Sequence, residues 1–168
     1  MTLNGDCADT NEARSMNGGE RSKMRGWSGV ALYEPKIEAN LGVTLRNAHA
    51  FGAAFVALIG HRYSHRVSTD TTDATQHIPV LYFRDWELFS ETMYKFPIVT
   101  VEVGRGVPLH KFEHPQHAIY LFGGEDRTVP VQTGLSCHIE SAYCLNLGVA
   151  VGVVLYARHA SMKGAYNQ

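Results

Sequence analysis

The run Asn40-Leu-Gly-Val-Thr-Leu-Arg46 opens the segment whose pattern decides how the first part of the chain folds. Asn is a residue type that caps helices, and Gly52 is a typical stop at the other end. Between them apolar residues recur at helical spacing, at Leu41, Leu45 and Ala48. The pattern predicts a helix from Asn40 to about Phe51. If this helix is considered alone, a capping role is sufficient for Asn40 and a surface ion pair is sufficient for Arg46.

Apolar runs that predict strands lie on both sides of this helix. They are Gly29–Tyr33, Ala53–Ile59, His77–Phe83, Ile98–Val103 and Ala118–Phe122. Asp85 can cap a further helix that buries Trp86, Phe89 and Met93. A last helix, Leu145–Ala160, is apolar nearly all round, which its own sheet and a second subunit together would explain. Alternating strands and helices predict an α/β fold, a parallel sheet with helices on both faces.

Length and composition fit one domain in a reducing compartment. The 168 residues suffice for one core, and a net charge of −1 gives no global nucleic-acid signature. Three cysteines, Cys7, Cys137 and Cys144, suggest no disulfide framework. The longest apolar run, Leu147–Ala157, is too short to span a bilayer. We therefore expect a soluble cytoplasmic protein.

Two polar segments are expected to lie outside the core. Residues 1–26 hold no aromatic residue and predict a flexible N-terminal tail, so that a single domain occupies residues 27–168. The stretch from His61 to Gln76 predicts a long surface loop.

The run Leu121-Phe-Gly-Gly-Glu125 ends the last predicted strand. Two glycines allow close approach of a ligand to the backbone, and parallel sheets bind ligands at the carboxyl ends of their strands. The alternative is a tight turn with an exposed acid. The G-x-G-x-x-G pattern of a dinucleotide site is absent.

A third run, Cys144-Leu-Asn146, precedes the apolar helix. Its Asn can cap the helix or offer its amide to a ligand. Cys144 fits a packing residue better than a nucleophile, because no paired His and acid is evident.

Nine histidines raise the possibility of a metal site. His61 and His65 lack the Glu of the zincin motif, and Cys137-His138 with Cys144 lacks a full tetrahedral set. The loop histidines His110, His114 and His117 have irregular spacing. Surface or RNA-facing imidazoles explain them better, and a small metal hydrolase stays as a remote alternative.

Taken in order, the three runs make the chain resemble the SpoU/TrmH branch of the SPOUT superfamily, which are knotted S-adenosylmethionine-dependent RNA methyltransferases. The first motif matches at Glu34-Pro35, Asn40, Gly42, Arg46, Asn47-Ala48 and Phe51-Gly52. The second and third match at Leu121-Phe122-Gly123, Glu125, Pro130 and Cys144-Leu145-Asn146. The resemblance covers the chain from about Gly29 to Ala157.

The resemblance implies a deep C-terminal trefoil knot, which general topology rules would not suggest. It also implies a homodimer formed through the first and last helices, S-adenosyl-L-methionine bound in the knot, and methylation of a ribose 2′-hydroxyl of tRNA or rRNA. By motif match, Arg46 is the catalytic arginine, assisted by Asn40 and Glu125. The implied cofactor-binding residues are Val103, Gly104, Leu121, Phe122, Gly123, Gly124, Ile139, Cys144, Leu145 and Asn146.

A guanidinium does not readily give up its proton, so we expect Arg46 to lower the pKa of the ribose hydroxyl by its charge. Thr128, Gly124 and Cys144 differ from the residues usual in the family, which leaves a catalytically silent RNA-binding or cofactor-sensing protein as an alternative. Candidate RNA-facing cations are Arg62, Arg66, Lys95, Arg105, Lys111 and Arg127.

Overall fold

The computed structural model describes residues 26–60, 76–130 and 133–164. The predicted N-terminal tail and the predicted loop from His61 to Gln76 fall almost entirely outside these ranges. Two of the candidate cations, Arg62 and Arg66, therefore lie outside the described residues.

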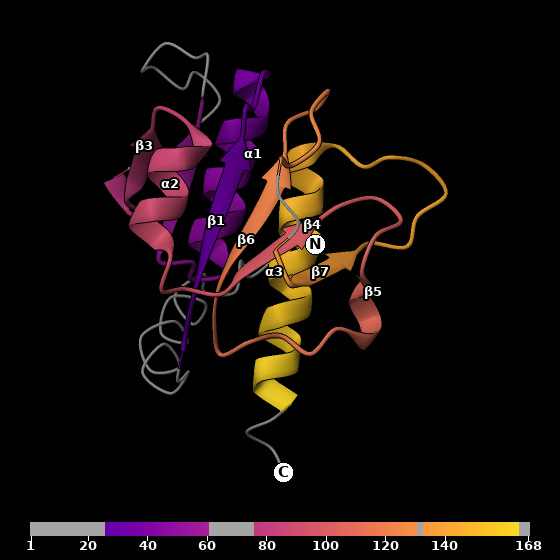
Figure 1. The fold of residues 1–168 in the computed structure, drawn as a ribbon. Coiled ribbons are helices and arrows are strands. Elements are labelled where there is room, and N and C mark those ends of the chain that lie inside the picture. The colour runs from indigo at the N-terminus through magenta and orange to yellow at the C-terminus, as the bar shows by residue number, and fades with distance from the viewer. Residues whose placement is uncertain (1–25, 61–75, 131–132, 165–168) are drawn as a thin grey trace, which may run out of the picture.

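The described residues form one seven-stranded sheet in which every neighbouring pair is parallel, in the order β3-β2-β1-β6-β4-β7-β5 (Figure 1). The strand bounds are β1 Trp27–Tyr33, β2 Phe55–Ile59, β3 Val80–Phe83, β4 Ile98–Val101, β5 Val107–Pro108, β6 His117–Gly123 and β7 Leu135–His138. The five predicted strands are confirmed, with ends that differ by up to three residues. The parallel arrangement is confirmed as well.

The two strands that were not predicted lie together at one edge of the sheet. Strand β5 has only two residues, and one of them is Pro108. Strand β7 buries only Cys137. Neither strand therefore shows the continuous apolar run that marks central strands such as β1 and β6.

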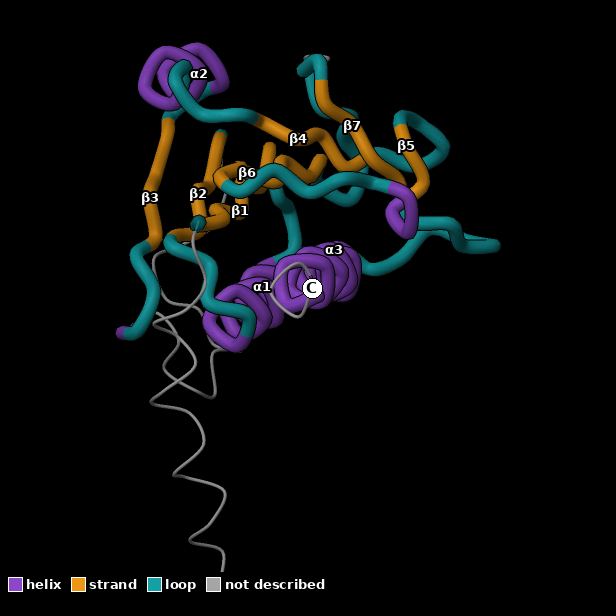
Figure 2. The backbone as a smooth tube through the Cα atoms, turned by 90° about the horizontal axis from the view of Figure 1, so that it is seen from below, coloured by secondary structure: helices purple, strands orange, loops and turns teal. Residues whose placement is uncertain are grey.

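Helices cover both faces of the sheet, as predicted (Figure 2). Helix α2, Trp86–Met93, packs on one face through Phe89 and Met93. Helices α1, Glu38–Ala50, and α3, Leu147–Gly164, lie side by side on the other face (Figures 1 and 2). The apolar core is thus split into two layers by the sheet.

The first helix begins earlier than its sequence suggested. The residue before α1 is Ile37, which makes no side-chain capping bond, and Asn40 lies inside the first turn with its side chain buried. The prediction of Asn40 as a helix cap is therefore wrong. The other end agrees with the prediction, since Gly52 follows α1 with a φ of +69°, a conformation that favours glycine.

The other two helix starts are capped by side chains. The Asp85 carboxylate accepts from the backbone N–H of Leu88, as predicted. Asn146 Oδ1 accepts from the backbone N–H of Gly148 at 3.0 Å, so α3 begins at Leu147 rather than Leu145.

Helices α1 and α3 approach each other closely at a glycine. A Cβ added to Gly148 would lie 2.7 Å from Val43 Cγ1, so a larger side chain would push the helices apart. Asn47 Nδ2 donates to the carbonyl of Gly148 at 2.9 Å. The outer side of this pair still exposes Val149, Val153 and Tyr156. Within the described residues, no helix is long and apolar enough to cross a membrane.

Candidate active site

A pocket of about 670 Å³ opens at the carboxyl ends of β4, β6 and β7, next to the starts of α1 and α3. This is the edge at which parallel α/β sheets bind ligands. The residues that line it are Ile37, Asn40, Val101, Glu102, Val103, Arg105, Phe122, Gly123, Gly124, Glu125, Asp126, Arg127, Thr128, Val129, Ile139, Ser141, Cys144, Leu145, Asn146, Leu147 and Ala150.

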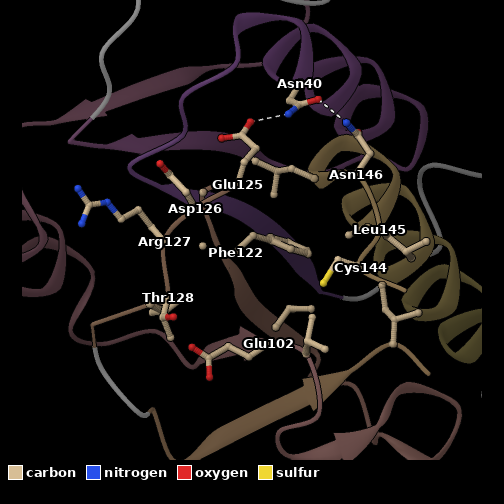
Figure 3. Close-up of a pocket in the computed structure, with 18 of the residues that line it drawn as sticks. Asn40, Glu102, Phe122, Glu125, Asp126, Arg127, Thr128, Cys144, Leu145 and Asn146 are labelled. Carbon is tan, nitrogen blue, oxygen red and sulfur yellow. Dashed lines mark hydrogen bonds between the residues drawn. The ribbon is translucent and has the colours of Figure 1, made fainter. Parts of the chain in front are cut away.

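One wall of the pocket is a chain of hydrogen bonds, which we call the pocket network and which consists of Asn40, Glu125 and Asn146 (Figure 3). Asn40 Nδ2 donates to Glu125 Oε1. Asn146 Nδ2 donates to Asn40 Oδ1 at 2.7 Å, and Asn146 Oδ1 caps α3. The network joins the three runs that the sequence separates by 85 and 106 residues.

The two ends of the network fix how its amides are oriented. An ionised carboxylate can only accept, so the amino group of Asn40 must face Glu125. The N–H groups at the start of α3 can only donate, so the carbonyl of Asn146 must face them. The amino group of Asn146 then points to the carbonyl of Asn40, and each bond in the chain pairs a donor with an acceptor.

Glu125 also holds the backbone that leads into α1. Its carboxylate accepts from the backbone N–H of Lys36 at 2.9 Å and from that of Ile37 at 3.3 Å. Burial alone would raise the pKa of Glu125, but the hydrogen bonds from its own backbone, Asn40, Lys36 and Ile37 together lower it. Glu125 is therefore an ionised anchor at neutral pH.

The Gly-rich turn requires both of its glycines. A Cβ on Gly123 would lie 2.2 Å from the carbonyl oxygen of Arg127, and one on Gly124 would lie 2.4 Å from that of Glu34. Glu34 itself has a φ of +46°, an uncommon and strained conformation for this residue type. Its carboxylate pairs with Arg127 at 3.1 Å, which ties the end of β1 to the turn.

The opposite wall is formed by two loops and is less tightly bonded. Glu102 follows β4 and pairs with Arg105 at 3.4 Å, and Ile139 and Leu145 add apolar surface. Cys144 is an exposed thiol at the pocket edge. Cys137, by contrast, is a buried residue of β7, and burial raises the pKa of its thiol to about 12.

Most of the residues singled out from the sequence line this pocket. Asn40 and Glu125 do so, together with eight of the implied cofactor residues, Val103, Phe122, Gly123, Gly124, Ile139, Cys144, Leu145 and Asn146. Gly104 is not among the lining residues. Leu121 is fully buried on the α2 face of the sheet, so its side chain points away from the pocket.

Arg46 also does not line the pocket of its own chain. It is exposed on α1, about two turns beyond Asn40. The exposed Val43 lies one turn before it on the same surface of the helix.

Among the lining residues to which the sequence gave no role of their own, Glu102 and Asp126 carry charge, although the resemblance places Glu102 within an implied cofactor loop, Val101–Gly104. Glu102 gave one usable signal, since it is an acid directly after an apolar strand and therefore at the carboxyl edge of the sheet. Asp126 pairs with Lys36 at 3.1 Å, and only the folded chain brings these two residues together.

Among the described residues, no group of three or more His, Cys, Asp or Glu is arranged to hold a metal ion. His110 instead pairs with Glu140 at 2.8 Å, and His114 bonds to Tyr120.

Comparison with known proteins identifies the family of the chain. The profile of the SpoU rRNA Methylase family matches residues 28–156. No curated protein sequence matches the chain.

Solved structures share the fold. An AdoMet-bound rRNA methyltransferase from Sinorhizobium meliloti superposes with a TM-score of 0.74 at 24% identity, covering 82% of this chain and 57% of its own length. A protein described in work on 2-OH methylation of C/U34 on tRNA gives 0.73 at 24% identity, covering 83% and 92%. The SpoU methyltransferase AviRb from Streptomyces viridochromogenes gives 0.74 at 18% identity, covering 86% and 63%. The chain thus spans little more than half of the Sinorhizobium protein.

Proposed function

The chain belongs to the SpoU rRNA Methylase family, and from this premise we propose that it is an S-adenosylmethionine-dependent RNA methyltransferase acting on a ribose 2′-hydroxyl of tRNA or rRNA. The observation that carries the proposal is the pocket network, in which Asn40, Glu125 and Asn146 meet at one wall of a pocket. Structures with the same fold include an AdoMet-bound rRNA methyltransferase and a protein described for 2-OH methylation of tRNA.

The residues of the pocket fit this cofactor. Its volume is in the usual range for small-molecule sites. Phe122, Ile139 and Leu145 offer apolar surface to a purine ring, and carboxylates suit a ligand that carries a sulfonium and an ammonium group. When bound, S-adenosylmethionine supplies the electrophilic methyl group.

The pocket network acts by positioning. Because the pKa of Glu125 is lowered, its carboxylate is a weak base at neutral pH. Its three hydrogen-bond partners instead fix the entry to α1 and, through Asn40 and Asn146, the start of α3. The walls that border the reacting groups are thereby held in one arrangement.

Arg46 is the proposed catalytic cation, and a second subunit would bring it to the site. Val43 and Arg46 share the exposed surface of α1, and Val43 contacts the start of α3. The exposed apolar residues of α3, Val149, Val153 and Tyr156, continue this surface. A homodimer through α1 and α3 would cover it, and Arg46 would then lie at the interface, within reach of the partner's pocket.

The proposal includes a deep trefoil knot at the C-terminal part of the chain. It is supported by the strand order, in which the late strand β7 lies between the earlier strands β4 and β5. RNA would approach over the pocket rim, where Arg105 and Arg127 lie. Such binding weakens as salt rises, because phosphate contacts release counterions.

The test combines a search for the substrate with one variant. Mass spectrometry of tRNA and rRNA ribose methylation, with and without the protein, is expected to show one mark that depends on it. In Arg46→Ala the rate of transfer is expected to fall by about 10²- to 10³-fold, as for loss of one charge-stabilising group, with cofactor binding unchanged. Arg84→Ala, an exposed cation remote from the pocket lining, is the matched control. Normal turnover of Arg46→Ala would contradict the assignment.

The same experiment addresses the cofactor-sensing alternative. Thr128 lines the pocket where the family pattern has a glycine. Cofactor binding by the unaltered protein without transfer to any RNA fraction would favour the silent protein over the enzyme.

A further inference from the structure

The loop wall of the pocket contains a carboxylate that the network does not use. Glu102 directly follows β4, and its backbone N–H donates to the carbonyl of Cys137 on β7 at 3.2 Å. Its side chain is only 15% exposed and lines the pocket. In Figure 3 it reaches into the pocket below Phe122, on the side opposite Asn40 and Asn146. The backbone bond fixes the position from which this side chain projects.

The carboxylate of Glu102 has acceptor capacity to spare. Its ion pair with Arg105 is long, at 3.4 Å, and engages only one of the two oxygens. An ionised carboxylate has about four acceptor positions and no donor, so it binds best to a ligand group with two adjacent hydroxyls or N–H groups. A half-buried acid in a pocket therefore selects for a donor pair.

The neighbours of Glu102 indicate which part of a ligand would lie beside it. Val101 and Val103 flank it along the chain, and Val101 pairs in register with Cys137, two residues before Ile139. Glu102 thus stands at the edge of an apolar surface formed by the ends of β4 and β7. An aromatic base would pack on that surface, and a sugar attached to the base would then lie at its polar edge.

We infer that Glu102 binds the vicinal 2′,3′-diol of the cofactor's ribose and thereby makes the pocket selective for a ribonucleoside. The inference rests on the proposed function, since it takes the ligand to be S-adenosylmethionine. Each hydroxyl donates one hydrogen bond to the carboxylate, and Arg105 balances the charge from the solvent side. Glu102 acts in recognition and takes no part in methyl transfer.

The test is a cycle that pairs a protein change with a ligand change. Calorimetry measures Kd for S-adenosylhomocysteine and for its 2′-deoxy and 3′-deoxy analogues, with the unaltered protein and with Glu102→Leu. Removing one hydroxyl is expected to weaken binding to the unaltered protein by about 10- to 100-fold, the range for a hydrogen bond to a charged group. In Glu102→Leu the parent ligand is expected to bind as weakly as the deoxy analogues, with the difference between them below about threefold.

Two further variants serve as controls. Glu102→Gln keeps the shape of the side chain and some acceptor capacity, and it is expected to give an intermediate loss. Glu91→Gln removes an exposed acid of α2 and is expected to leave the Kd of the parent ligand and of the deoxy analogues unchanged.

The outcomes separate the inference from the proposed function. Full discrimination between ribose and deoxyribose in Glu102→Leu and Glu102→Gln would overturn the inference alone. A much larger loss for S-adenosylmethionine than for S-adenosylhomocysteine would overturn it too, because it would mean that the carboxylate faces the sulfonium. Failure of the unaltered protein to bind either ligand would overturn both proposals.

Discussion

Two polar clusters tie helix α3 to strand β6 and its following turn, and they differ in what they face. The pocket network joins the residue before α3 to Glu125, just past β6. The second, which we call the sealed cluster, consists of His114, Tyr120 and Arg158 and lies farther along α3, toward the amino ends of β1 and β6. The first opens into the pocket, whereas Tyr120 and Arg158 of the second are buried.

The sealed cluster is built around an arginine without a carboxylate partner among the described residues. Arg158 is 4% exposed and donates to the carbonyls of Trp27 and Gln116, at 3.1 and 2.7 Å. It also lies near Tyr120, whose hydroxyl lies 2.7 Å from His114 Nδ1. Backbone carbonyls thus take the place of a counterion.

Both clusters fix the position of α3, but one does so beside the pocket and the other in the buried core. The pocket network keeps an anion ionised beside a cavity, where a ligand can meet it. In the sealed cluster, Arg158 donates to backbone carbonyls, and none of the three residues lines the pocket. We therefore expect changes in the sealed cluster to act on stability, and changes in the pocket network to act on binding.

The largest effect is expected for Arg158→Ala. The substitution removes two hydrogen bonds to backbone carbonyls and a packed side chain, so the free energy of unfolding should fall by about 4 kcal/mol. Urea denaturation measures it, with the exposed Arg84→Ala as a control that should change it by less than about 0.5 kcal/mol. Below the melting transition, S-adenosylhomocysteine should bind Arg158→Ala as it binds the unaltered protein. A tenfold loss of that affinity would break the distinction between the two clusters.

The next effect is a pH dependence that belongs to His114. Burial, and secondarily the charge of Arg158, lower the pKa of His114 from 6.5 to about 4. Between these values the unfolded chain binds more protons, so the folded state loses stability as pH falls from 6.5 to 4, by up to roughly 3 kcal/mol, and keeps it fully above 6.5. Urea titrations at pH 4.5 and 7 should show a smaller pH effect in His114→Asn than in the unaltered protein. The exposed His117→Asn serves as the control, and an equal change in both variants would refute the assignment.

A smaller stability effect, but a larger binding effect, is expected for Glu125→Gln. The new amide places a donor where Lys36, Ile37 and Asn40 already donate, at a cost of about 1–2 kcal/mol in unfolding free energy. Because the pKa of Glu125 is lowered from 4.5, the contribution is present above pH 4.5 and fades below it. Calorimetry should show about tenfold weaker binding of S-adenosylhomocysteine. Glu91→Gln, which removes an exposed acid of α2 that does not line the pocket, should bind normally.

The smallest effect is expected for Tyr120→Phe. It removes the hydroxyl that bonds to His114 but keeps the buried ring, so the free energy of unfolding should fall by about 1 kcal/mol. Ligand affinity should not change. An unaltered pH dependence in this variant would mean that His114 titrates independently of the cluster.

Most of the fold could be predicted from local pattern because its central strands are continuously apolar. Strands β1 and β6 and the cap at Asp85 follow from short-range rules. The edge strands β5 and β7 could not be predicted, since two residues with a proline, or four with one buried cysteine, carry no periodic signal.

Some residues of the candidate site could likewise be predicted from local sequence, and others could not. The glycines of the turn and the Asn146 cap could be inferred because their roles depend on adjacent backbone. Leu121 was assigned to the cofactor by its place in a motif, but the alternation of side chains along β6 directs it to the opposite face. Glu102 received no individual role from the sequence because its surroundings come from β7, far along the chain.

The sequence by itself determined the three helices and every strand except β5 and β7, the glycine turn and the family to which the chain belongs. Only the tertiary structure decided what Asn40 does. A helix cap is a local bond, so sequence favoured that role, yet Asn40 lies within the first turn of α1 and bonds to Glu125 and Asn146. Those partners lie 85 and 106 residues away. Hydrogen bonding depends on distance in space, which these residues acquire only when the sheet brings the ends of β1, β6 and α3 together.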